Sequence, residues 1–454
     1  MLASLLGAAL ALTMPPFGLG WLAPLPLALL LARFRGPRRA REAFWAGVGY
    51  WAVLLAWLPW SFAEMFGPLG ALPFVPMILA EAAFWAVLVA LFGSRGLALV
   101  GAWWFLDRLR AHLGVLAFPW GDFGYALVDA PGRWLAALGG VGLLSLVVLL
   151  VAYALARGRY AVLLAWALLW FVPLPQTAPD RQALLVQGAV DPLGKVRGES
   201  AEARYLELTR AGLARHPEAD LVVWPETAVA RLPRGLEEVL GGRDLLTGLA
   251  AYDGGYRNRV VWWREGEVLG HYDKTRLVPF GEFFPWRGAL GWLYDYFFDA
   301  FGLGPLADTV PGGRAEPLGP YGVYICYESA FPGVARTLAR GGARVLVNVS
   351  NDAWFGPSFG GAQHFAMGRL RAVETGRWLL RAGNDGVTAA IDPYGRVAAR
   401  LPAGEPGYLA APYALEGGAT PYVRWGDLPV ALLAGGLVVW GWTRRRRGLP
   451  FAQF

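Results

Sequence analysis

"VYICYES", residues 323–329, contains the only cysteine of this 454-residue chain, at the point where an apolar strand runs into polar residues. A free cysteine is frequently a small buried hydrophobe with no chemical role. A lone cysteine is also a candidate nucleophile when the fold brings polar partners to it. The four histidines are scattered, and nothing near them in sequence supports or excludes a Cys–His pair: His112, His216, His271 and His364.

Two other apolar runs also end in polar residues. "LVVWPET" (221–227) places Glu226 just after a strand-like run, and "GHYDKTRLVPFGEFFP" (270–285) contains Lys274 and Glu282. In α/β sheets the loops at the strand ends collect the reactive groups. Three such loops would bring a carboxylate, an amine and a thiol together.

Residues 176–427 alternate short apolar runs with helical stretches, which indicates a layered α/β domain. The expected buried strands are residues 182–190, 220–224, 259–263, 322–325 and 344–349. A helix is expected over 200–215, with Ser200 as its N-cap and Pro217 just beyond its end. The sequence has no glycine-rich phosphate loop and no metal-ligand spacing, so we expect neither a cofactor nor a metal.

Lysine is rare in this chain. Of 41 basic residues, 39 are arginines and only Lys195 and Lys274 are lysines. A lysine therefore suggests a site that needs a compact or titratable amine, which arginine cannot supply. Lys195 lies in a polar loop, as an ordinary surface lysine does, whereas the position of Lys274 after a strand favours a functional role.

Glutamate, lysine and cysteine together suggest nucleophilic acyl transfer. A thiol becomes a nucleophile when a base takes its proton or a nearby cation lowers its pKa. Glu226 would be that base, and Lys274 would stabilise the thiolate and then the tetrahedral oxyanion, together with a backbone N–H near Tyr327. Glu282 and Glu328 either pair with arginines or orient Lys274 and shape the pocket.

The composition points to a membrane protein. The chain is 56% hydrophobic and 17% charged, whereas soluble domains have about 45–50% apolar and about 25% charged residues. The apolar excess lies mainly in residues 1–175 and 428–442. We therefore predict a transmembrane domain of about seven helices over 1–175, a soluble domain over 176–427, and a C-terminal membrane helix with a basic tail over 428–454.

Eight apolar runs are candidate membrane helices: residues 2–14, 21–32, 43–60, 69–92, 96–106, 134–156, 160–172 and 428–442. Several are shorter than the roughly 20 residues that a spanning helix needs, and 96–106 is the weakest. The first run lacks the basic flank of a signal peptide, so we expect a helix there.

Arginine positions favour eight spans with the N-terminus inside. Twelve arginines then face the cytoplasm, against three in the short outer loops, Arg108, Arg110 and Arg133. The twelve are Arg33, Arg35, Arg38, Arg39, Arg41, Arg95, Arg157, Arg159 and the four arginines of residues 444–447. Without the fifth span the tally becomes nine against six. This topology places the soluble domain on the periplasmic side, and anionic inner-leaflet lipids explain the net charge of +7 without nucleic acid.

Residues 283–306 are rich in aromatic side chains but contain too many breakers for a spanning helix. "FPWGDFGY" (118–125) has the same character. Trp and Tyr settle at the headgroup level of a bilayer, so we expect both stretches to form a lipid-access gate over the thiol, although ordinary core packing is the alternative. The gate candidates are Trp286, Trp292, Tyr294 and Phe298.

The three polar segments resemble the carbon–nitrogen hydrolase (nitrilase) superfamily, whose signature is a Glu–Lys–Cys triad in this chain order on an αββα sandwich. More narrowly, the whole chain is similar to the apolipoprotein N-acyltransferases, the membrane-embedded branch of that superfamily. The matching stretches are "WPET" (224–227), "TRLVPFGEFFP" (275–285), "ICYES" (325–329) and "NVSNDAWFGPSFGGAQHF" (348–365). The resemblance implies that Glu226, Lys274 and Cys326 are the triad.

The resemblance also implies a two-step reaction. Cys326 takes an acyl chain from a phospholipid as a thioester, and the α-amine of a diacylglyceryl-cysteine apolipoprotein accepts it. Asn258, Glu282, Tyr327 and Glu328 occupy positions that matter in the family. A bacterial inner-membrane enzyme is implied, with its catalytic domain facing the periplasm, and we expect a monomer that binds no nucleic acid.

The chain departs from the family pattern at one arm. Family members often have a Trp shortly after "QGN", whereas "VQGAVDPLGKVRG" (186–198) has Ala189 in place of Asn and Val196 near the Trp position. The family pattern therefore does not predict which contacts residues 186–198 make at the entrance to the site.

Two other functions explain part of the sequence. A membrane-tethered amidase or nitrilase acting on a small substrate explains the triad but not seven preceding spans. A transporter or scaffold with a degenerate domain predicts several charged residues inside the spans, whereas Glu81 is the only charge within the predicted runs.

Overall fold

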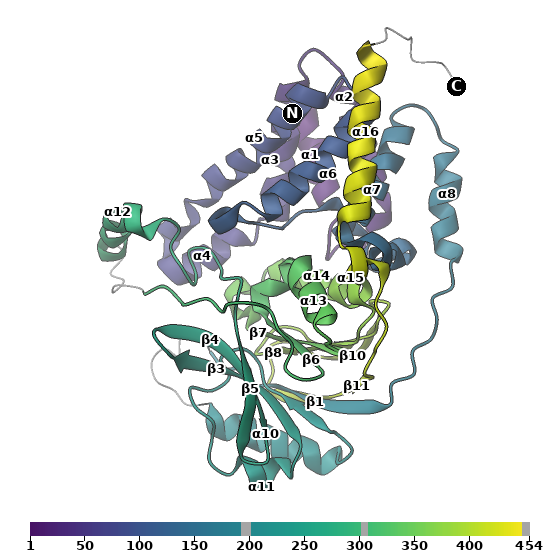
Figure 1. Cartoon of the computed structure of the whole chain (residues 1–454). Coiled ribbons are helices and arrows are strands. Elements are labelled where there is room, and N and C mark those ends of the chain that lie inside the picture. Colours follow the sequence, from purple (N-terminus) through teal and green to yellow (C-terminus); the bar gives the residue numbers. More distant parts are fainter. Residues whose placement is uncertain (192–200, 301–306, 447–454) are drawn as a thin grey trace. The chain divides into compact units, whose positions relative to one another are not determined.

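The structure is a computed structural model that describes residues 1–191, 201–300 and 307–446 (Figure 1). The described chain divides into two compact units. The first comprises Met1–Glu64, Pro68–Leu174 and the residues from Trp425 onward, and the second comprises Met65–Gly67 and Pro175–Arg424. The predictions for Lys195, Val196 and the N-cap Ser200 lie outside the described residues.

The first unit is helical. Its helices are α1 (Leu2–Ala11), α2 (Pro24–Arg33), α3 (Arg39–Leu54), α4 (Leu58–Phe66), α5 (Phe74–Phe92), α6 (Leu97–Ala111), α7 (Ala136–Leu155), α8 (Val162–Leu168) and α16 (Leu428–Arg446). Small residues let some of these backbones approach closely, as is common between membrane helices. A Cβ added to Gly101 of α6 would lie 2.2 Å from the carbonyl oxygen of Ala434 in α16. The last helix of the chain therefore packs directly on α6.

The predicted count of eight spans is not confirmed. Among the described residues, two helical segments are long and apolar enough to cross a membrane, Phe74–Phe92 and Pro131–Leu155. A third candidate is the pair Arg39–Leu54 and Leu58–Glu64, which is bent by 53° at its break. Four shorter apolar helices match other predicted runs: Leu2–Ala11, Gly20–Arg33, Val162–Phe171 and Leu428–Thr443.

Helix α6 extends beyond the run predicted at 96–106 and ends at Ala111. Arg108 and Arg110 therefore belong to this helix, and their assignment to an outer loop is wrong. Because buried Arg110 donates through Nε to Glu81 Oε2 at 2.6 Å, the guanidinium and the carboxylate neutralise each other inside the helical unit. Asp107 Oδ1 lies 3.5 Å from Arg110 Nη1. An ion pair that links α5 to α6 in this way explains how Glu81 is accommodated.

The second unit contains two β-sheets. The six-stranded sheet has the order β11-β1-β2-β3-β4-β5, and the five-stranded sheet has the order β10-β9-β8-β7-β6. The strands of the first are β1 (Arg181–Gln187), β2 (Leu221–Val223), β3 (Asp244–Tyr252), β4 (Tyr256–Arg264), β5 (Glu267–Asp273) and β11 (Gly407–Tyr413). Those of the second are β6 (Tyr321–Ile325), β7 (Val345–Ser350), β8 (Leu379–Gly383), β9 (Thr388–Ile391) and β10 (Val397–Leu401).

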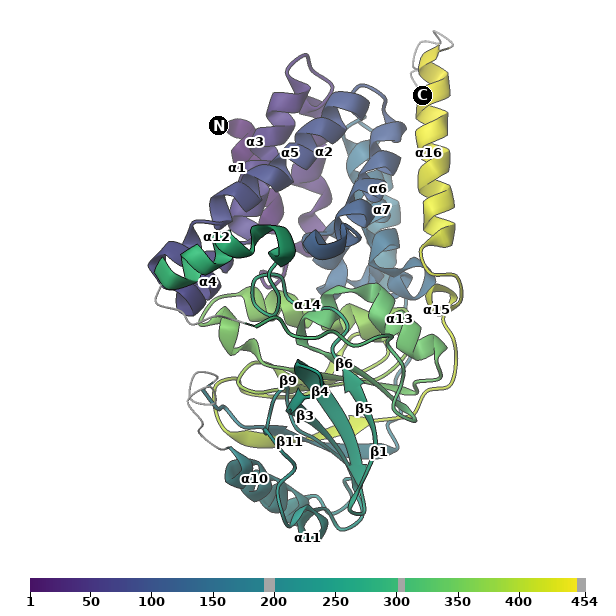
Figure 2. The same ribbon diagram turned by 60° about the vertical axis from the view of Figure 1, so that its left-hand side comes forward.

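The two sheets pack face to face between helices. β1 and β11 of the first sheet contact β8, β9 and β10 of the second. The outer layers are α10 (Glu202–Arg215) with α11 (Leu236–Leu240) on the first sheet, and α13 (Pro332–Arg340) with α14 (Gly360–Thr375) on the second (Figures 1 and 2). The unit also contains α12 (Arg287–Ala300), α15 (Pro421–Trp425) and the short 3-10 helix η7 (Cys326–Ala330). This is the αββα sandwich that was expected.

The five predicted strands overlap β1, β2, β4, β6 and β7, and the predicted helix over 200–215 corresponds to α10. Six observed strands were not predicted. Among them, β5 and β10 lie at sheet edges and are largely exposed, so their sequences lack the apolar run that signals a buried strand. The strands β1–β2–β3 run parallel in the first sheet, and β6–β7–β8 run parallel in the second, where β6 is an edge strand. Glu226 follows β2, and Cys326 follows β6, so both lie at carboxyl ends of parallel strands.

Candidate active site

Cys326 follows β6 and is the first residue of η7. Its φ angle is +47°, a left-handed conformation that residues other than glycine seldom adopt. Such strained backbone clusters at functional sites, where the surrounding structure holds it in place. The residue as a whole is partly exposed, so the sharp turn presents the nucleophile candidate at the carboxyl end of the parallel sheet.

Glu226 follows β2 and is buried. Its Oε1 accepts a hydrogen bond from Asn258 Nδ2 at 2.6 Å, and its Oε2 accepts one from the backbone N–H of Asn351 at 2.8 Å. Asn258 lies on β4, whereas Asn351 directly follows β7 of the other sheet. The carboxylate is therefore held between the two sheets in one orientation.

Lys274 directly follows β5 and is only 2% exposed. Its ammonium donates to Glu282 Oε1 at 2.8 Å and lies 3.4 Å from Glu226 Oε1. The backbone N–H of Lys274 donates to the carbonyl of Asn258 at 2.9 Å, which fixes the start of the loop. The structure therefore brings together the glutamate and the lysine that the sequence analysis singled out.

Glu282 acts on this lysine rather than on an arginine. Its Oε1 accepts from both Lys274 Nζ and Asn258 Nδ2, the latter at 3.1 Å, and its Oε2 accepts from the backbone N–H of Val278 at 2.8 Å. Asn258 thus donates to two carboxylates that both contact the same ammonium. Of the two predicted alternatives for Glu282, orienting Lys274 is the one that its contacts fit.

Glu328 joins the turn of Cys326 to the loop of Lys274 without contacting either side chain directly. The fully buried carboxylate accepts from the hydroxyl of Tyr272 at 2.8 Å and from the backbone N–H of Ile325 at 2.7 Å. Its Oε1 also accepts from Thr275, which follows Lys274. Within the described residues, its hydrogen-bond partners are these groups and the backbone N–H of Arg276, so no arginine side chain pairs with it.

Tyr327 is buried, and its ring packs edge-on against Phe331 at 5.2 Å between ring centroids. Its backbone belongs to the first turn of η7, where N–H groups lack partners within the helix. The assignment of an oxyanion donor near Tyr327 stays a prediction.

Burial and nearby charges shift the pKa values of Lys274 and Cys326. Although burial opposes it, the carboxylates of Glu282 and Glu226 raise the pKa of Lys274 well above its usual value, so the amine is charged. Burial raises the pKa of the Cys326 thiol far above that of an ordinary cysteine, and the Glu226 carboxylate adds to this, while Lys274 opposes it. The resting nucleophile is therefore a neutral thiol that needs a base.

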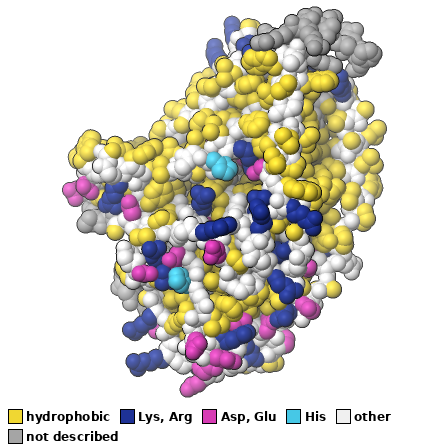
Figure 3. Space-filling model, viewed as in Figure 1, with side chains coloured by type: hydrophobic (Ala, Val, Ile, Leu, Met, Phe, Trp, Pro, Cys, Tyr) yellow, Lys and Arg dark blue, Asp and Glu magenta, His cyan; other side chains and the backbone are white. Residues whose placement is uncertain are grey.

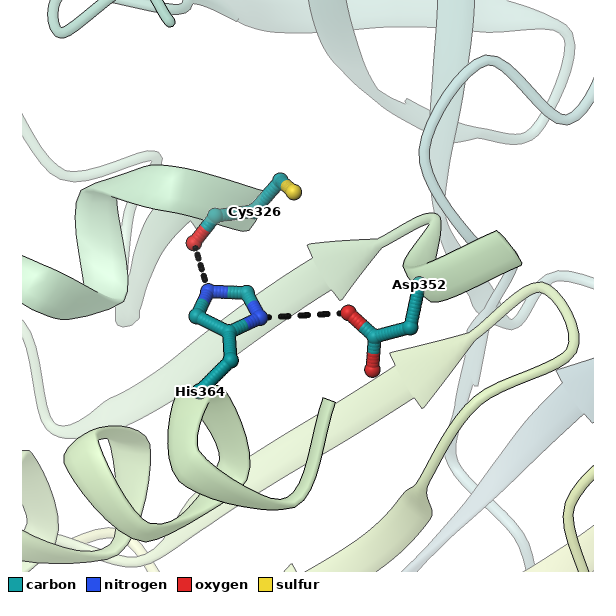
Figure 4. Close-up of side chains that lie close together, drawn as sticks. All are labelled: Cys326, Asp352 and His364. Atoms are coloured by element: carbon teal, nitrogen blue, oxygen red, sulfur yellow. Dashed lines mark hydrogen bonds and ion pairs between the residues drawn. The ribbon is translucent and has the colours of Figure 1, made fainter. Parts of the chain in front are cut away.

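A second polar network adjoins the backbone of Cys326 (Figure 4). His364 Nε2 lies 2.8 Å from the carbonyl oxygen of Cys326, and Nδ1 lies 3.1 Å from Asp352 Oδ1. Arg381 in turn donates to Asp352 Oδ2 at 2.6 Å. Because a carbonyl oxygen only accepts, Nε2 carries a proton and donates it to the backbone of the nucleophile.

The sequence alone did not predict this network, although two of its residues lie in a stretch that carries the family resemblance. His364 and Asp352 both lie in the stretch 348–365 that carried the family resemblance, but only the fold brings His364 to Cys326. The thiol, carboxylate and imidazole lie within 4.8 Å of one another and are of types that bind zinc. The imidazole and the carboxylate are already engaged in hydrogen bonds with Cys326 and Arg381, so these contacts favour a structural role for the cluster over metal binding.

Comparison with known proteins places this geometry in a family. The carbon–nitrogen hydrolase model matches residues 242–418, and the model of the apolipoprotein N-acyltransferase N-terminal domain matches residues 6–154. An apolipoprotein N-acyltransferase from Azotobacter vinelandii is 36% identical over 98% of this chain and 95% of its own length. The chain belongs to the apolipoprotein N-acyltransferase family.

A second curated relative agrees. An apolipoprotein N-acyltransferase from Methylococcus capsulatus is 34% identical over 98% of this chain and 96% of its own length. A solved carbon–nitrogen hydrolase from Helicobacter pylori G27 is 18% identical, covers 55% of this chain and 94% of its own, and superimposes with a TM-score of 0.39.

Ala189, which stands where the family resemblance implies an Asn, has a left-handed backbone. Its φ angle is +47°. Asn tolerates this left-handed conformation better than Ala because its side chain can bond locally. The chain therefore keeps the backbone bend without the residue that favours it.

The four gate candidates of this family member divide into two pairs. Trp286 and Trp292 are 55% and 71% exposed. Phe298 is buried and packs on Phe284 at 4.8 Å between ring centroids, and Tyr294 packs on the same ring at 5.1 Å. Of these four candidates the two tryptophans are therefore the exposed ones, while Tyr294 and Phe298 pack on Phe284, shortly before the start of α12.

The expected gate at 118–125 is wrong. Trp120, Phe123 and Tyr125 are all at most 4% exposed, because this stretch forms the core of the helical unit. Tyr50 donates its hydroxyl to the carbonyl of Gly121 at 2.7 Å, which fixes the segment from within. Ordinary core packing, the alternative considered for this stretch, is what the structure has.

Proposed function

We propose that this chain transfers an acyl chain from a phospholipid to the N-terminal amine of a diacylglyceryl-cysteine apolipoprotein, through a thioester on Cys326. The observation that carries this proposal is the buried pair of Glu226 and Lys274, joined by Glu282 and Asn258, at the strand ends where Cys326 also lies. Membership of the apolipoprotein N-acyltransferase family supplies the substrate class.

In the first half-reaction the sulfur of Cys326 attacks the ester carbonyl of the phospholipid while Glu226 takes the thiol proton. The tetrahedral oxyanion forms next to the ammonium of Lys274. Collapse of the intermediate breaks the ester C–O bond, the leaving alkoxide takes the proton from Glu226, and a lysophospholipid departs. The thioester remains on Cys326.

In the second half-reaction the free α-amine of the apolipoprotein attacks the thioester. Glu226 takes a proton from the amine, the C–S bond breaks, and the thiolate of Cys326 recovers the proton. An amide forms and the enzyme returns to its starting state. Lys274 serves both steps because each passes through an oxyanion at the same carbon, and we assign Glu282, Asn258, Tyr327 and Glu328 to holding the triad and its pocket.

We further propose the topology and boundaries that the arginine distribution favours. Residues 1–175 and 428–454 would supply eight spans in a bacterial inner membrane, and residues 176–427 would face the periplasm. The apolar helices of the first unit and the family name support the membrane location. The basic loops then contact lipid headgroups, and we expect a monomer that binds no nucleic acid.

The test is intact-mass spectrometry of the purified chain after incubation with a phospholipid labelled in its acyl chains. We expect one acyl adduct that an apolipoprotein peptide with a diacylglyceryl-cysteine discharges as an amide. Cys326→Ser should form no adduct, because a neutral hydroxyl is a far weaker nucleophile than a thiolate.

The carbon–nitrogen hydrolase match favours one alternative, a membrane-tethered amidase for small substrates. That enzyme would hydrolyse a small amide and leave the labelled phospholipid intact. Hydrolysis without a lipid adduct would overturn the acyltransferase proposal.

A further inference from the structure

The second unit has a basic cavity that the proposed acyl transfer does not use. It has a volume of about 400 Å³, and its wall includes four arginines and a single carboxylate. These charged residues are Arg340, Arg344, Arg377, Arg424 and Glu416. Figure 3 shows dark-blue basic side chains gathered over α13 and α15, the elements that carry Arg340 and Arg424.

The cavity lies at the edge of the sheet opposite Cys326. Arg344 directly precedes β7, and Arg377 lies two residues before β8. Because β6, β7 and β8 are parallel, their amino ends lie a strand length, roughly 17 Å, from the carboxyl end that carries Cys326. A ligand in the cavity is therefore not the molecule whose ester reacts.

Arg377 is built into the floor of this cavity. It is 3% exposed, and its Nε donates to the carbonyl of Ala343 at 3.0 Å. Its Nη1 donates to the carbonyls of Thr375 and Gly418. In the described part of the chain, Nη2 has no hydrogen bond to protein, and the residue lines the cavity.

The other three arginines line the cavity, and none of their guanidinium groups forms an ion pair within the described residues. Arg344 Nη2 donates to the carbonyl of Leu415 at 3.0 Å, whereas the side chains of Arg340 and Arg424 make no ion pair or hydrogen bond within the residues that the structure describes. Glu416 also forms no salt bridge in the described residues. Four arginines and one glutamate give the lining a net charge of about +3.

Helix α15 is fixed in place next to α13. Arg336 of α13 donates to the carbonyls of Tyr422 and Arg424 at 3.0 and 3.3 Å. Thr420 caps α15, because its hydroxyl accepts from the backbone N–H of Val423 at 3.1 Å. The backbone that carries Arg424 is therefore held next to α13.

The chain itself puts this cavity near a membrane surface. Arg424 lies four positions before Leu428, the first residue of apolar α16, and four residues span at most about 14 Å. Between them, Trp425 is 57% exposed, and exposed tryptophans settle at the headgroup level of bilayers. This step rests on the proposed role of α16 as a membrane span.

We propose that the cavity binds the phosphate headgroup of an anionic membrane phospholipid and so anchors the catalytic unit to the bilayer surface. Guanidinium groups match phosphate oxygens in geometry and charge. Small residues such as Ala339, Gly342 and Gly417 leave space between the arginines for a headgroup. The bound lipid is a positioning ligand, separate from the acyl donor.

The test is native mass spectrometry of the full chain in detergent, titrated with phosphatidylglycerol or phosphatidylcholine. We expect Arg340→Glu/Arg424→Glu to lower the affinity for phosphatidylglycerol at least about tenfold, since basic residues near anionic lipids contribute strongly to binding. Arg340→Gln/Arg424→Gln is a milder second variant that should give a smaller loss in the same direction. Arg210→Glu/Arg234→Glu, which changes two exposed arginines elsewhere by the same charge, should bind as the wild type does.

Equal binding of both lipids by the wild type, or equal losses in the variant and the control, would overturn the proposal. Complete competition by inorganic phosphate at millimolar concentration would also overturn it, because the site would then recognise a free anion. Thioester formation from saturating donor in detergent should be unchanged in the arginine variants. Failure of the proposed function would instead appear as a wild type without thioester, so the two failures are distinguishable.

Discussion

Glu328 binds Thr275 through two hydrogen bonds to one carboxylate oxygen, from the backbone N–H at 2.8 Å and from the hydroxyl at 2.6 Å. Thr275 follows Lys274 in the chain, and Glu328 stands two residues after Cys326. The carboxylate of Glu328 therefore sets the distance between the loop that carries Lys274, the proposed cation beside the oxyanion, and the turn that carries Cys326, the proposed nucleophile.

Glu328→Gln should damage both stability and activity. The amide nitrogen of Gln cannot accept a hydrogen bond, so either Ile325 N–H or the Thr275 donors lose their partner. Because hydrogen bonds to a charged group contribute about 1.5–3 kcal/mol, we expect a loss of that order in the free energy of unfolding, measured by thermal unfolding in detergent. Exposed Glu207→Gln is the matched control, and a Glu328→Gln protein as stable as this control would contradict the clamp.

Lys274→Arg should lower the rate of thioester formation about 10²–10³-fold, the usual cost of one lost oxyanion group. The charge is kept, but the wider planar guanidinium cannot occupy the buried position between Glu282 and Glu226. Single-turnover acylation with labelled phospholipid measures this. Lys195→Arg, at the only other lysine, should act at the wild-type rate, and near-normal acylation in Lys274→Arg would show that the position needs only charge.

Glu226→Gln should slow both half-reactions by about 10²–10⁴-fold, the range for one lost general base. Gln keeps the shape and the contacts with Asn258 in part but removes the basicity. The two steps are measured separately, as thioester formation and as discharge to an apolipoprotein peptide. If Lys274 alone held Cys326 as a thiolate, the variant would acylate at the wild-type rate, and Glu226 would be a positioning residue.

His364 is predicted to be a positioning residue for the Cys326 backbone. His364→Ala removes the donor to the Cys326 carbonyl, and loss of one such hydrogen bond should lower kcat about tenfold with little change in KM. Gln offers an amide N–H in a similar place and should recover part of the loss. Equal activity of the Ala and Gln variants would show that the ring acts through its volume and not through its donor.

Alkylation of Cys326 should keep accelerating at alkaline pH. Burial and the Glu226 carboxylate raise its pKa, so the reactive thiolate is scarce and its fraction grows tenfold per pH unit below that pKa. An ordinary thiol, with a pKa of about 8.5, levels off near pH 10. Because the chain has one cysteine, the same protein unfolded in detergent is the matched control. A plateau of the folded protein below pH 9 would mean a resting thiolate and would contradict the shift.

The sequence predicted the segments of the candidate site better than their connections. Glu226 and Cys326 each follow an apolar strand, and strand ends in α/β sheets converge, so the pattern alone predicted their proximity. Lys274 follows the exposed edge strand β5, and the rarity of lysine in the chain singled it out instead. The contact between His364 and Cys326 was not, because it joins residues 38 positions apart through a helix whose packing the sequence does not state. The partners of Glu328 could not be predicted either, because several of them are backbone N–H groups, which every residue type except proline has.

In the helical unit, hydropathy did not predict where α6 ends. Hydropathy located the apolar helices but ended the fifth run at residue 106, because Asp107, Arg108 and Arg110 look like the start of a loop. In the structure the helix continues to Ala111, and Glu81 neutralises Arg110. A charge that finds its partner on another helix cannot be told from a loop charge by hydropathy.

The left-handed backbone of Cys326 sets thermostability against catalysis. A non-glycine residue in this conformation costs about 1–2 kcal/mol, whereas glycine would accept it for about 0.5–1 kcal/mol of extra chain entropy. A Cys326→Gly protein should therefore fold at least as well as the natural chain while lacking its nucleophile. Directed evolution that selects only for heat resistance would drift toward such inert sequences, and only selection on acyl transfer itself would keep the thiol.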